Sequence, residues 1–355
     1  MDSNRQSPPS TARVVAVVTF YMTAALVMVF VNKAVLNSSP DLPLLFLLIQ
    51  LVIAVILLQT SAFFTPKVEI PKFDLLAAKK LTPVVLVNII GLVFNTLCLR
   101  SVEASFFQIA RGLVLPLTIA VSSAATSSSP SARVVIAAAV VMAGFFIGIA
   151  PEGNLPVSAI PSTLSLFYGV LSSLFIALHA VLIKASLPYC GNSTIQLAWW
   201  TNLGSAAFLV PFVLLDGEVG TLFALMASPE WNMRTFIWGS LVTGVFGFLL
   251  CVAGLLSIKV TSPITHMFSS AARSGIQTLL GVWLFRDVLT LNRIVSITTI
   301  LIGTMYYTWV KSAEGAKPPP PRAMDLEAMG SGDRQPKEET IVWQAPEKEL
   351  GEDSE

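Results

Sequence analysis

Charged side chains are scarce in this chain of 355 residues. Asp, Glu, Lys and Arg make up 12% of the sequence and hydrophobic residues make up 54%, whereas a soluble domain averages about 25% charged residues. The net charge is +1, so there is no overall basic field of the kind that attracts nucleic acid. This composition is typical of a chain surrounded by lipid, and it overrides the two soluble domains that the length alone would suggest.

Cysteine and deeply placed acidic residues are also few. Cys98, Cys190 and Cys251 are isolated and lie in or beside apolar segments, so they predict neither a disulfide framework nor a metal site. No Asp or Glu falls deep inside an apolar segment. Proton-coupled carriers commonly use buried carboxylates as relays, so proton coupling is disfavoured. Because no acidic pair or metal-ligand spacing suits catalysis either, we expect no enzyme activity, no cofactor and no metal.

The sequence is rich instead in long apolar runs. Ten runs have about 20 residues each, the length that crosses a bilayer. They cover residues 14–36, 42–64, 81–99, 104–125, 133–150, 163–186, 194–215, 235–257, 262–284 and 293–310. The third and fourth runs are separated by only a tight link. We therefore predict an all-α membrane protein with ten transmembrane helices.

Lysine and arginine are distributed unevenly between these runs. They follow the second, fourth, sixth and eighth runs, whereas the segment after the fifth, PEGNLPVSAIPS, has none. The positive-inside rule therefore predicts that both termini are cytosolic. The expected organisation is a cytosolic N-terminal segment (1–13), a first transmembrane repeat (14–150), a luminal linker (151–162), a second transmembrane repeat (163–311) and a disordered cytosolic tail (312–355).

The two halves of the chain show weak self-similarity. In each half a helix with small-residue spacing, marked by Gly91 or by Gly244 and Gly247, precedes a very short turn and an arginine-bearing helix. With five spans per half, a duplicated half would insert in the opposite orientation. Transporters often use this arrangement and bind their ligand near the midplane between the repeats. The predicted fold is therefore two inverted five-helix repeats.

The ninth run contains an arginine. In SPITHMFSSAARSGIQTLLGVWL, the polar residues His266, Ser270, Arg273 and Gln277 recur at steps of three and four residues and share one helical face. An arginine at this depth costs roughly 2.5–3.5 kcal/mol on insertion scales, so it normally faces a wet cavity or an anionic partner. Arg273 could instead pair with helix carbonyls, and His266 could contact a ligand or a neighbouring helix.

A second arginine, Arg111, lies in the fourth run with Ser105 and Gln108 on its face. Two guanidinium groups in an otherwise apolar protein predict a pocket for a negatively charged ligand. The planar guanidinium suits phosphate oxygens in particular, because these accept paired hydrogen bonds.

The seventh run contains a compact aromatic and amide group, Trp199, Trp200, Thr201 and Asn202. A ring face can stack on a base, and an amide can donate and accept along a base edge. The alternative is that the tryptophans anchor the helix at the membrane interface. The adjacent Asn202 favours a binding site.

Three further polar residues are candidates for a polar cavity: Tyr21 and Lys33 of the first run and Asn95 of the third. Each could equally take part in an interhelical hydrogen bond.

Several of these stretches resemble the nucleotide-sugar transporters of the drug/metabolite transporter superfamily, most closely the GDP-fucose transporters of the Golgi. IKVTSPITHMFSSAARSGIQTLLGVWLF and YYTWVK carry the resemblance, with weaker similarity in FNTLCLRSVEASFFQIARGL. In guanine-nucleotide-sugar carriers an F-Y-N-N motif helps to read the base, and Trp199 to Asn202 stand in its place. A small-residue stretch ending in lysine serves phosphate and sugar there, and Ser270 to Arg273 stand in its place.

The resemblance implies a ten-helix antiporter that exchanges a cytosolic nucleotide sugar for a luminal nucleoside monophosphate. The interpretation is a multi-pass protein of the Golgi membrane, with the ER membrane as an alternative. Its partners would be these two ligands and lipid, without nucleic acid, and a homodimer is compatible with it. Two other interpretations stay open: a triose-phosphate-type exchanger of phosphorylated metabolites, and a polytopic enzyme or scaffold acting on lipid-linked sugars.

Overall fold

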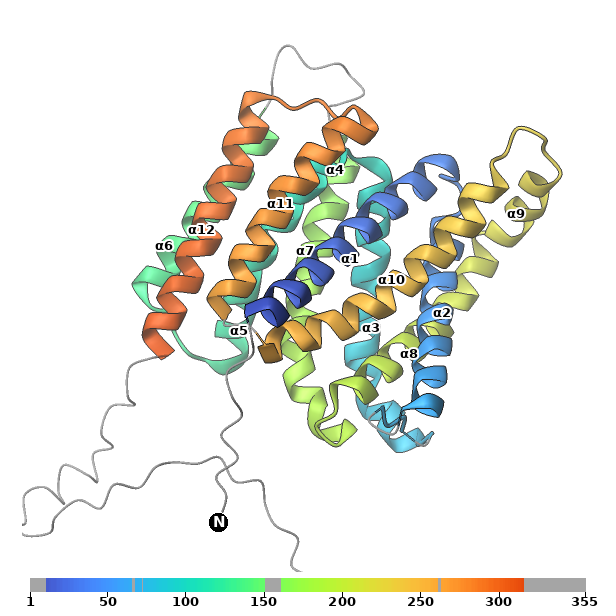
Figure 1. The fold of residues 1–355 in the computed structure, drawn as a ribbon, viewed down its shortest axis with the longest axis horizontal. Helices are drawn as coiled ribbons and strands as arrows, with labels where there is room; N and C mark the ends of the chain where they lie inside the picture. The colour runs from blue at the N-terminus through green and yellow to red at the C-terminus, as the bar shows by residue number, and fades with distance from the viewer. Residues whose placement is uncertain (1–10, 66–67, 72, 151–160, 261–262, 316–355) are drawn as a thin grey trace, which may run out of the picture. The chain divides into compact units, whose positions relative to one another are not determined.

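The structure is a computed structural model that describes residues 11–65, 68–71, 73–150, 161–260 and 263–315, which form helices and no strand (Figure 1). The predicted linker and tail lie almost wholly outside this part of the chain, as does most of the N-terminal segment. The helices are α1 (Thr11–Ser38), α2 (Pro43–Phe64), α3 (Leu75–Ser101), α4 (Ala104–Gly112), α5 (Val114–Thr126), α6 (Ala132–Ile149), α7 (Thr163–Ser186), η2 (Leu187–Cys190), α8 (Thr194–Leu215), α9 (Glu218–Met226), α10 (Met233–Val260), α11 (Pro263–Phe285) and α12 (Leu291–Gly315).

Eight segments of the described chain are long and apolar enough to cross a membrane, from α1 through α8 and the first part of α10. The predicted all-helical membrane fold is therefore confirmed, whereas the count of ten spans stays a prediction. Helices α11 and α12 have 23 and 25 residues, which is long enough to span. They are not among the eight because polar residues, including the Arg273 face of α11, lower their hydropathy.

The fourth predicted span is a broken helix. Pro116 has no N–H to donate to the carbonyl of Gly112, four residues earlier, and the chain leaves the regular helix at Leu113 between α4 and α5. The link to the preceding helix is even shorter than the four residues between the predicted runs, because only Val102 and Glu103 separate α3 from α4.

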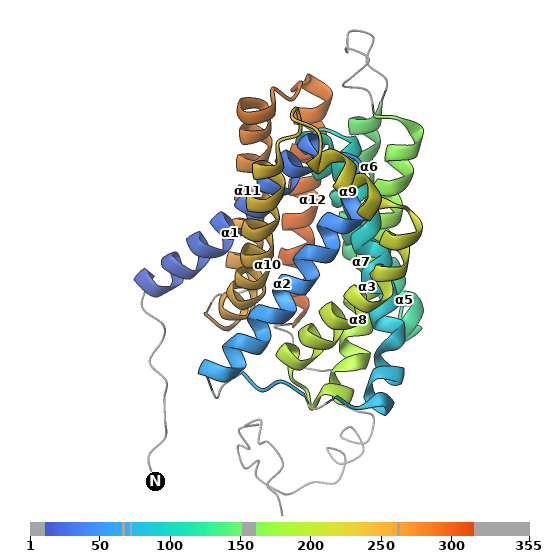
Figure 2. The same ribbon diagram turned by 90° about the vertical axis from the view of Figure 1, so that its right-hand side faces the viewer.

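The most extensive helix contacts join distant parts of the chain, α3 with α7 and α1 with α10. Figures 1 and 2 show α1 and α10 side by side in both views. Glycines permit this close approach, as their spacing predicted: a Cβ added at Gly91 of α3 would lie only 3.1 Å from Phe175 Cβ of α7. In the same way, a Cβ at Gly244 of α10 would lie 2.7 Å from Ile53 of α2.

Helix α9 was not predicted, and it completes the start of α2. The N-cap position of α2 is Leu42, which has no side-chain oxygen. The first free N–H groups of α2 donate instead to the Glu218 carboxylate, from Leu44 at 3.0 Å and from Leu45 at 2.5 Å. Glu218 is only 1% exposed. A buried helix end needs such partners, because its first N–H groups have none within the helix.

Loss of this cap should weaken the fold. We expect Glu218→Ala to lower the free energy of unfolding by about 0.5–2 kcal/mol, the usual cost of removing a helix N-cap. Glu218→Gln keeps one acceptor oxygen and should cost less. Thermal unfolding of the detergent-solubilised variants measures both effects, and equal Tm values for wild type and Glu218→Ala would contradict the assignment.

Glu218 should also make stability depend on pH. Burial raises the pKa of its carboxyl group, although the N–H groups of Leu45 and Leu44 oppose that rise. Because the folded pKa lies above the ordinary 4.5, the stabilising effect is fully present below that value and is lost as pH rises through the folded pKa. The Tm of wild type relative to Glu218→Gln should therefore fall as pH is raised from 4.5 through this window. A difference that does not vary with pH would contradict this.

Candidate functional site

A cavity of about 360 Å³ lies between α4, α5, α7, α11 and α12. Three of its polar lining residues, Gln108, Arg111 and Arg273, belong to the faces that the sequence marked in the fourth and ninth spans. No carboxylate is present among the described residues that line it. The polar and charged lining residues are Gln108, Arg111, Thr118, Arg273, Ser274, Thr304 and Tyr307.

Both predicted arginines line this cavity, and both lie near aromatic rings. The guanidinium carbon of Arg111 lies 5.7 Å from the centre of the Phe107 ring, and that of Arg273 lies 5.9 Å from the centre of the Tyr21 ring. An aromatic face attracts a cation without neutralising it. Two arginines thus line the cavity in a largely apolar surrounding, which favours an anionic ligand.

Two amides accompany the arginines. Gln108 of α4 donates to Ser274 Oγ of α11 at 2.7 Å, which links the two arginine-bearing helices. Gln277 lies one turn further along α11 and is 2% exposed, and its Nε2 has no hydrogen-bond partner among the described residues. The side chains of His266 and Ser270, the other predicted members of this face, lie outside the described part of the structure.

The predicted aromatic and amide group of the seventh span is not part of this cavity. Trp199 donates from its ring N–H to Gln59 Oε1 of α2 at 3.0 Å, and Trp200 packs on the ring of Phe73, 5.4 Å away. Both are buried in an apolar cluster between α2, α3 and α8.

The two polar residues of this group bond to their own helix. Thr201 Oγ1 donates to Leu197 O at 2.9 Å, and Asn202 Nδ2 donates to Ala198 O at 2.7 Å. Neither residue is among those that line the cavity of Arg111 and Arg273, which we call the arginine cavity.

Lys33 and Asn95 also contact other helices. Lys33 is 7% exposed, and its Nζ donates to carbonyl oxygens at the end of α3, with distances of 2.9 Å to Leu99 and 2.7 Å to Val102. Asn95 accepts a hydrogen bond from Ser172 Oγ of α7 at 3.4 Å. The interhelical alternative is therefore what the structure shows for Asn95, and Lys33 neutralises the partial negative charge of a helix end.

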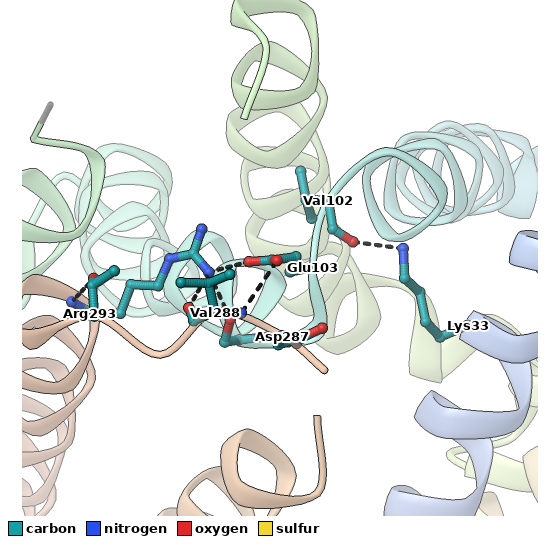
Figure 3. Close-up of polar contacts among 8 residues, drawn as sticks. Lys33, Val102, Glu103, Asp287, Val288 and Arg293 are labelled. Carbon is teal, nitrogen blue, oxygen red and sulfur yellow. Dashed lines mark hydrogen bonds and ion pairs between the residues drawn. The ribbon is translucent and has the colours of Figure 1, made fainter. Parts of the chain in front are cut away.

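The sequence reasoning missed an ion pair between Glu103 and Arg293 (Figure 3). In the sequence, both residues lie at the edges of predicted spans. Asp287 lies beside them, 6% exposed, and accepts a hydrogen bond from Ser105 N at 3.1 Å. Burial raises the pKa of Asp287, and the N–H of Ser105 opposes that rise. The sequence did contain a signal for this contact: Glu103, Asp287 and Arg293 are opposite charges at span ends, and the predicted topology places these ends on the same side of the membrane.

Residues 12–308 match the Triose-phosphate Transporter family, which covers most of the chain. The chain belongs to this family. It is similar to GDP-fucose transporter 1 of Nematostella vectensis, with 32% identity over 86% of this chain and 91% of the relative. It is also similar to GDP-fucose transporter 1 of Mus musculus, with 30% identity over 86% of this chain and 85% of the relative. The Golgi GDP-fucose transporter of Drosophila melanogaster has 26% identity to this chain, over 84% of this chain and 90% of the relative.

A crystal structure aligns with this fold at a TM-score of 0.50 and 12% identity, over 86% of this chain and all of the other. The fold is therefore shared with an experimentally determined protein. The family and the relatives are transporters, which confirms the predicted resemblance and places the chain among carriers rather than enzymes.

Proposed function

We propose that this protein is a nucleotide-sugar antiporter of the Golgi membrane that imports GDP-fucose into the lumen in exchange for GMP. Both termini face the cytosol in this proposal, which follows the distribution of lysine and arginine between the spans. The proposal draws on GDP-fucose transporters being similar to this chain over nearly their whole length.

The presence of two arginines in one cavity is the observation that carries the proposal. Arg111 and Arg273 come from α4 and α11 and line the same space. A nucleotide sugar presents a diphosphate, whose oxygens accept paired hydrogen bonds from guanidinium groups. The cavity volume of about 360 Å³ lies within the range of small-molecule sites. In this proposal Arg111 and Arg273 hold the phosphates, Gln108 contributes to the polar lining, and Gln277 lies one turn further along α11.

The proposed architecture is ten spans in two inverted repeats. Long helices α11 and α12 would complete the ten, with α4 and α5 counted as one span. In such a duplication each span corresponds to the span five places later, so α1 corresponds to α7, α2 to α8 and α3 to α10. The α3–α7 contact then corresponds to the α10–α1 contact. The α2–α10 contact corresponds in the same way to the α8–α3 contact. All four contacts are present, which supports a duplicated arrangement of the two halves.

A second candidate function is exchange of a smaller phosphorylated metabolite of the triose-phosphate type. One observation favours it: Trp200, which would stack on a base, is buried in a separate apolar cluster. Asn202 bonds to its own helix, and neither residue lines the arginine cavity. A ligand without a base would need only the arginine cavity. Uptake of a panel of labelled nucleotide sugars and triose phosphates by reconstituted protein distinguishes the two functions.

Exchange predicts a specific dependence on the contents of the vesicle. Liposomes that contain the purified protein and are preloaded with GMP should take up GDP-fucose faster than empty liposomes, because the exchange of anions needs no proton relay. Radiolabelled uptake measures this, with protein-free liposomes as the control. Equal uptake by empty liposomes, or uptake abolished by collapsing a proton gradient, would contradict the exchange proposal.

Arg273→Ala should greatly reduce binding and transport while the fold is kept. Loss of one charged hydrogen bond costs about 1.5–3 kcal/mol, or roughly ten- to a hundredfold in Kd. The Tm should stay similar or rise slightly, because the charge is costly to bury when no ligand is bound. Arg234→Ala is the matched control, since Arg234 is exposed on α10. Wild-type uptake by well-folded Arg273→Ala would make this arginine structural.

Base choice should depend on Asn202 if the seventh-span motif reads the base. The Asn202 amide would have to leave its bond to Ala198 O and then donate and accept at a base edge. Asn202→Ala should therefore reduce discrimination between GMP and UMP as competitors of uptake, whereas Arg273→Ala should weaken both alike. An unchanged preference ratio in Asn202→Ala would place base recognition elsewhere.

A further inference from the structure

Buried polar groups close one end of the helix bundle, where α4 begins and the link from α11 to α12 passes over it (Figure 3). The Glu103 carboxylate is paired with Arg293 and accepts the N–H of Val288 at 3.3 Å. Arg293 Nη1 also donates to Ser105 Oγ at 3.3 Å and to Val288 O at 2.6 Å. Asp287 accepts the N–H of Ser105. We refer to Glu103, Ser105, Asp287 and Arg293 as the α4 lock.

The α4 lock and the arginine cavity occupy different levels of the same helices. On α4, Ser105 precedes Arg111 by six residues, or about 9 Å along the helix axis. On α12, Arg293 lies in the first turn, whereas the cavity is lined only from Ile300 onward, as far as Tyr307. The cavity therefore extends away from the lock, and the lock closes the end that the cavity does not reach.

The polar contacts of the lock join the start of α4 to the α11–α12 region. Lys33 of α1 donates to carbonyl oxygens of α3, so those two helices stay joined whatever the lock does. Glu103 and Ser105 belong to the start of α4, whereas Asp287 lies in the α11–α12 link and Arg293 in the first turn of α12. Separation of the link and the start of α12 from α4 would break the contacts between these two pairs of residues and no other ion pair among the described residues.

The chemistry of the lock suits a contact that opens repeatedly. Arg293 is 3% exposed and its partner Glu103 is 21% exposed, so the pair is largely, though not fully, dehydrated while the lock is closed. The attraction within a buried ion pair offsets the free energy lost on dehydration only when the geometry of the pair is good. When water enters, both charges regain hydration together, and the attraction between them contributes little free energy. Separation into water thus differs from deletion of one partner, which would leave the other charge buried.

We propose that the α4 lock is the gate at this end of the transport path, and that it separates when the carrier turns its cavity to that side. This inference rests on the proposed exchange function, because exchange requires the cavity to open at each end in turn. Glu103, Asp287 and Arg293 are thereby positioning residues that touch no ligand.

Gly281 of α11 offers a way to disturb the lock without removing a charge. A Cβ added there would lie 2.8 Å from Asp287 Oδ2 and 3.3 Å from Ala104 Cβ. Gly275 lies on the same helix, and a Cβ added there would meet nothing within 4 Å. Gly281→Ala and Gly275→Ala therefore form a matched pair.

The test uses Ser105→Cys as a reporter, because this side chain is part of the lock and is 0% exposed while the lock is closed. Full-length protein in lipid nanodiscs is treated with a charged thiol reagent, and modification of residue 105 is followed by peptide mass spectrometry, so the native cysteines can remain. Adding Glu103→Gln or Arg293→Gln should raise the modification rate about tenfold, which corresponds to about 1.4 kcal/mol in the opening equilibrium. Gly281→Ala should also raise it, whereas Arg293→Lys and Gly275→Ala should leave it near the reporter's rate.

Two outcomes would overturn the proposal. One is an unchanged modification rate in Glu103→Gln, Arg293→Gln and Gly281→Ala. The other is loss of the folded protein in all three, because a contact that breaks in every cycle cannot be one on which the fold depends. The reporter needs no substrate, so a failure of GDP-fucose uptake would leave this result standing and would count only against the proposed function.

Discussion

Lipid offers no hydrogen bonds, and this constraint decides how the helix ends of this protein are built. The N-cap residues of α2 and α4, Leu42 and Glu103, make no side-chain cap of their own. Glu218 and Asp287 supply the missing acceptors from more than 170 residues further along the chain. Lys33 performs the opposite task at the end of α3. Much of the polar chemistry inside the bundle is thus the completion of one helix by a distant one.

The parts of the structure that follow from local pattern were predictable from the sequence. Apolar length identified the spans, and the two-residue link before Ala104 was visible as a gap between apolar runs. The three- and four-residue steps around Arg273 placed it on a polar face, and Arg273 itself lines a cavity with Arg111. Such predictions succeed because an arginine in an apolar segment must either face a polar space or find a partner.

The parts that depend on which helices meet were not predictable. Whether Asn95 faces a ligand or Ser172 depends on which helix packs against α3, and a single sequence does not predict which helix that is. The same holds for Glu103 and Arg293, which become a pair only when two span ends meet. Pro116 did carry a usable local signal, since a proline inside a span marks the place where the helical hydrogen bonds are interrupted.

The pairing of α1 with α10 has a consequence for biogenesis. Met233, where α10 begins, is synthesised about 200 residues after α1 ends at Ser38. At about 5–20 residues per second, α1 waits roughly 10–40 s for its main partner. During that time lipid or a chaperone must cover the face that α10 will occupy. The membrane thus holds the first spans as separate helices before they assemble, and a ribosome that stalls before Met233 leaves a chain whose first helix lacks its main partner.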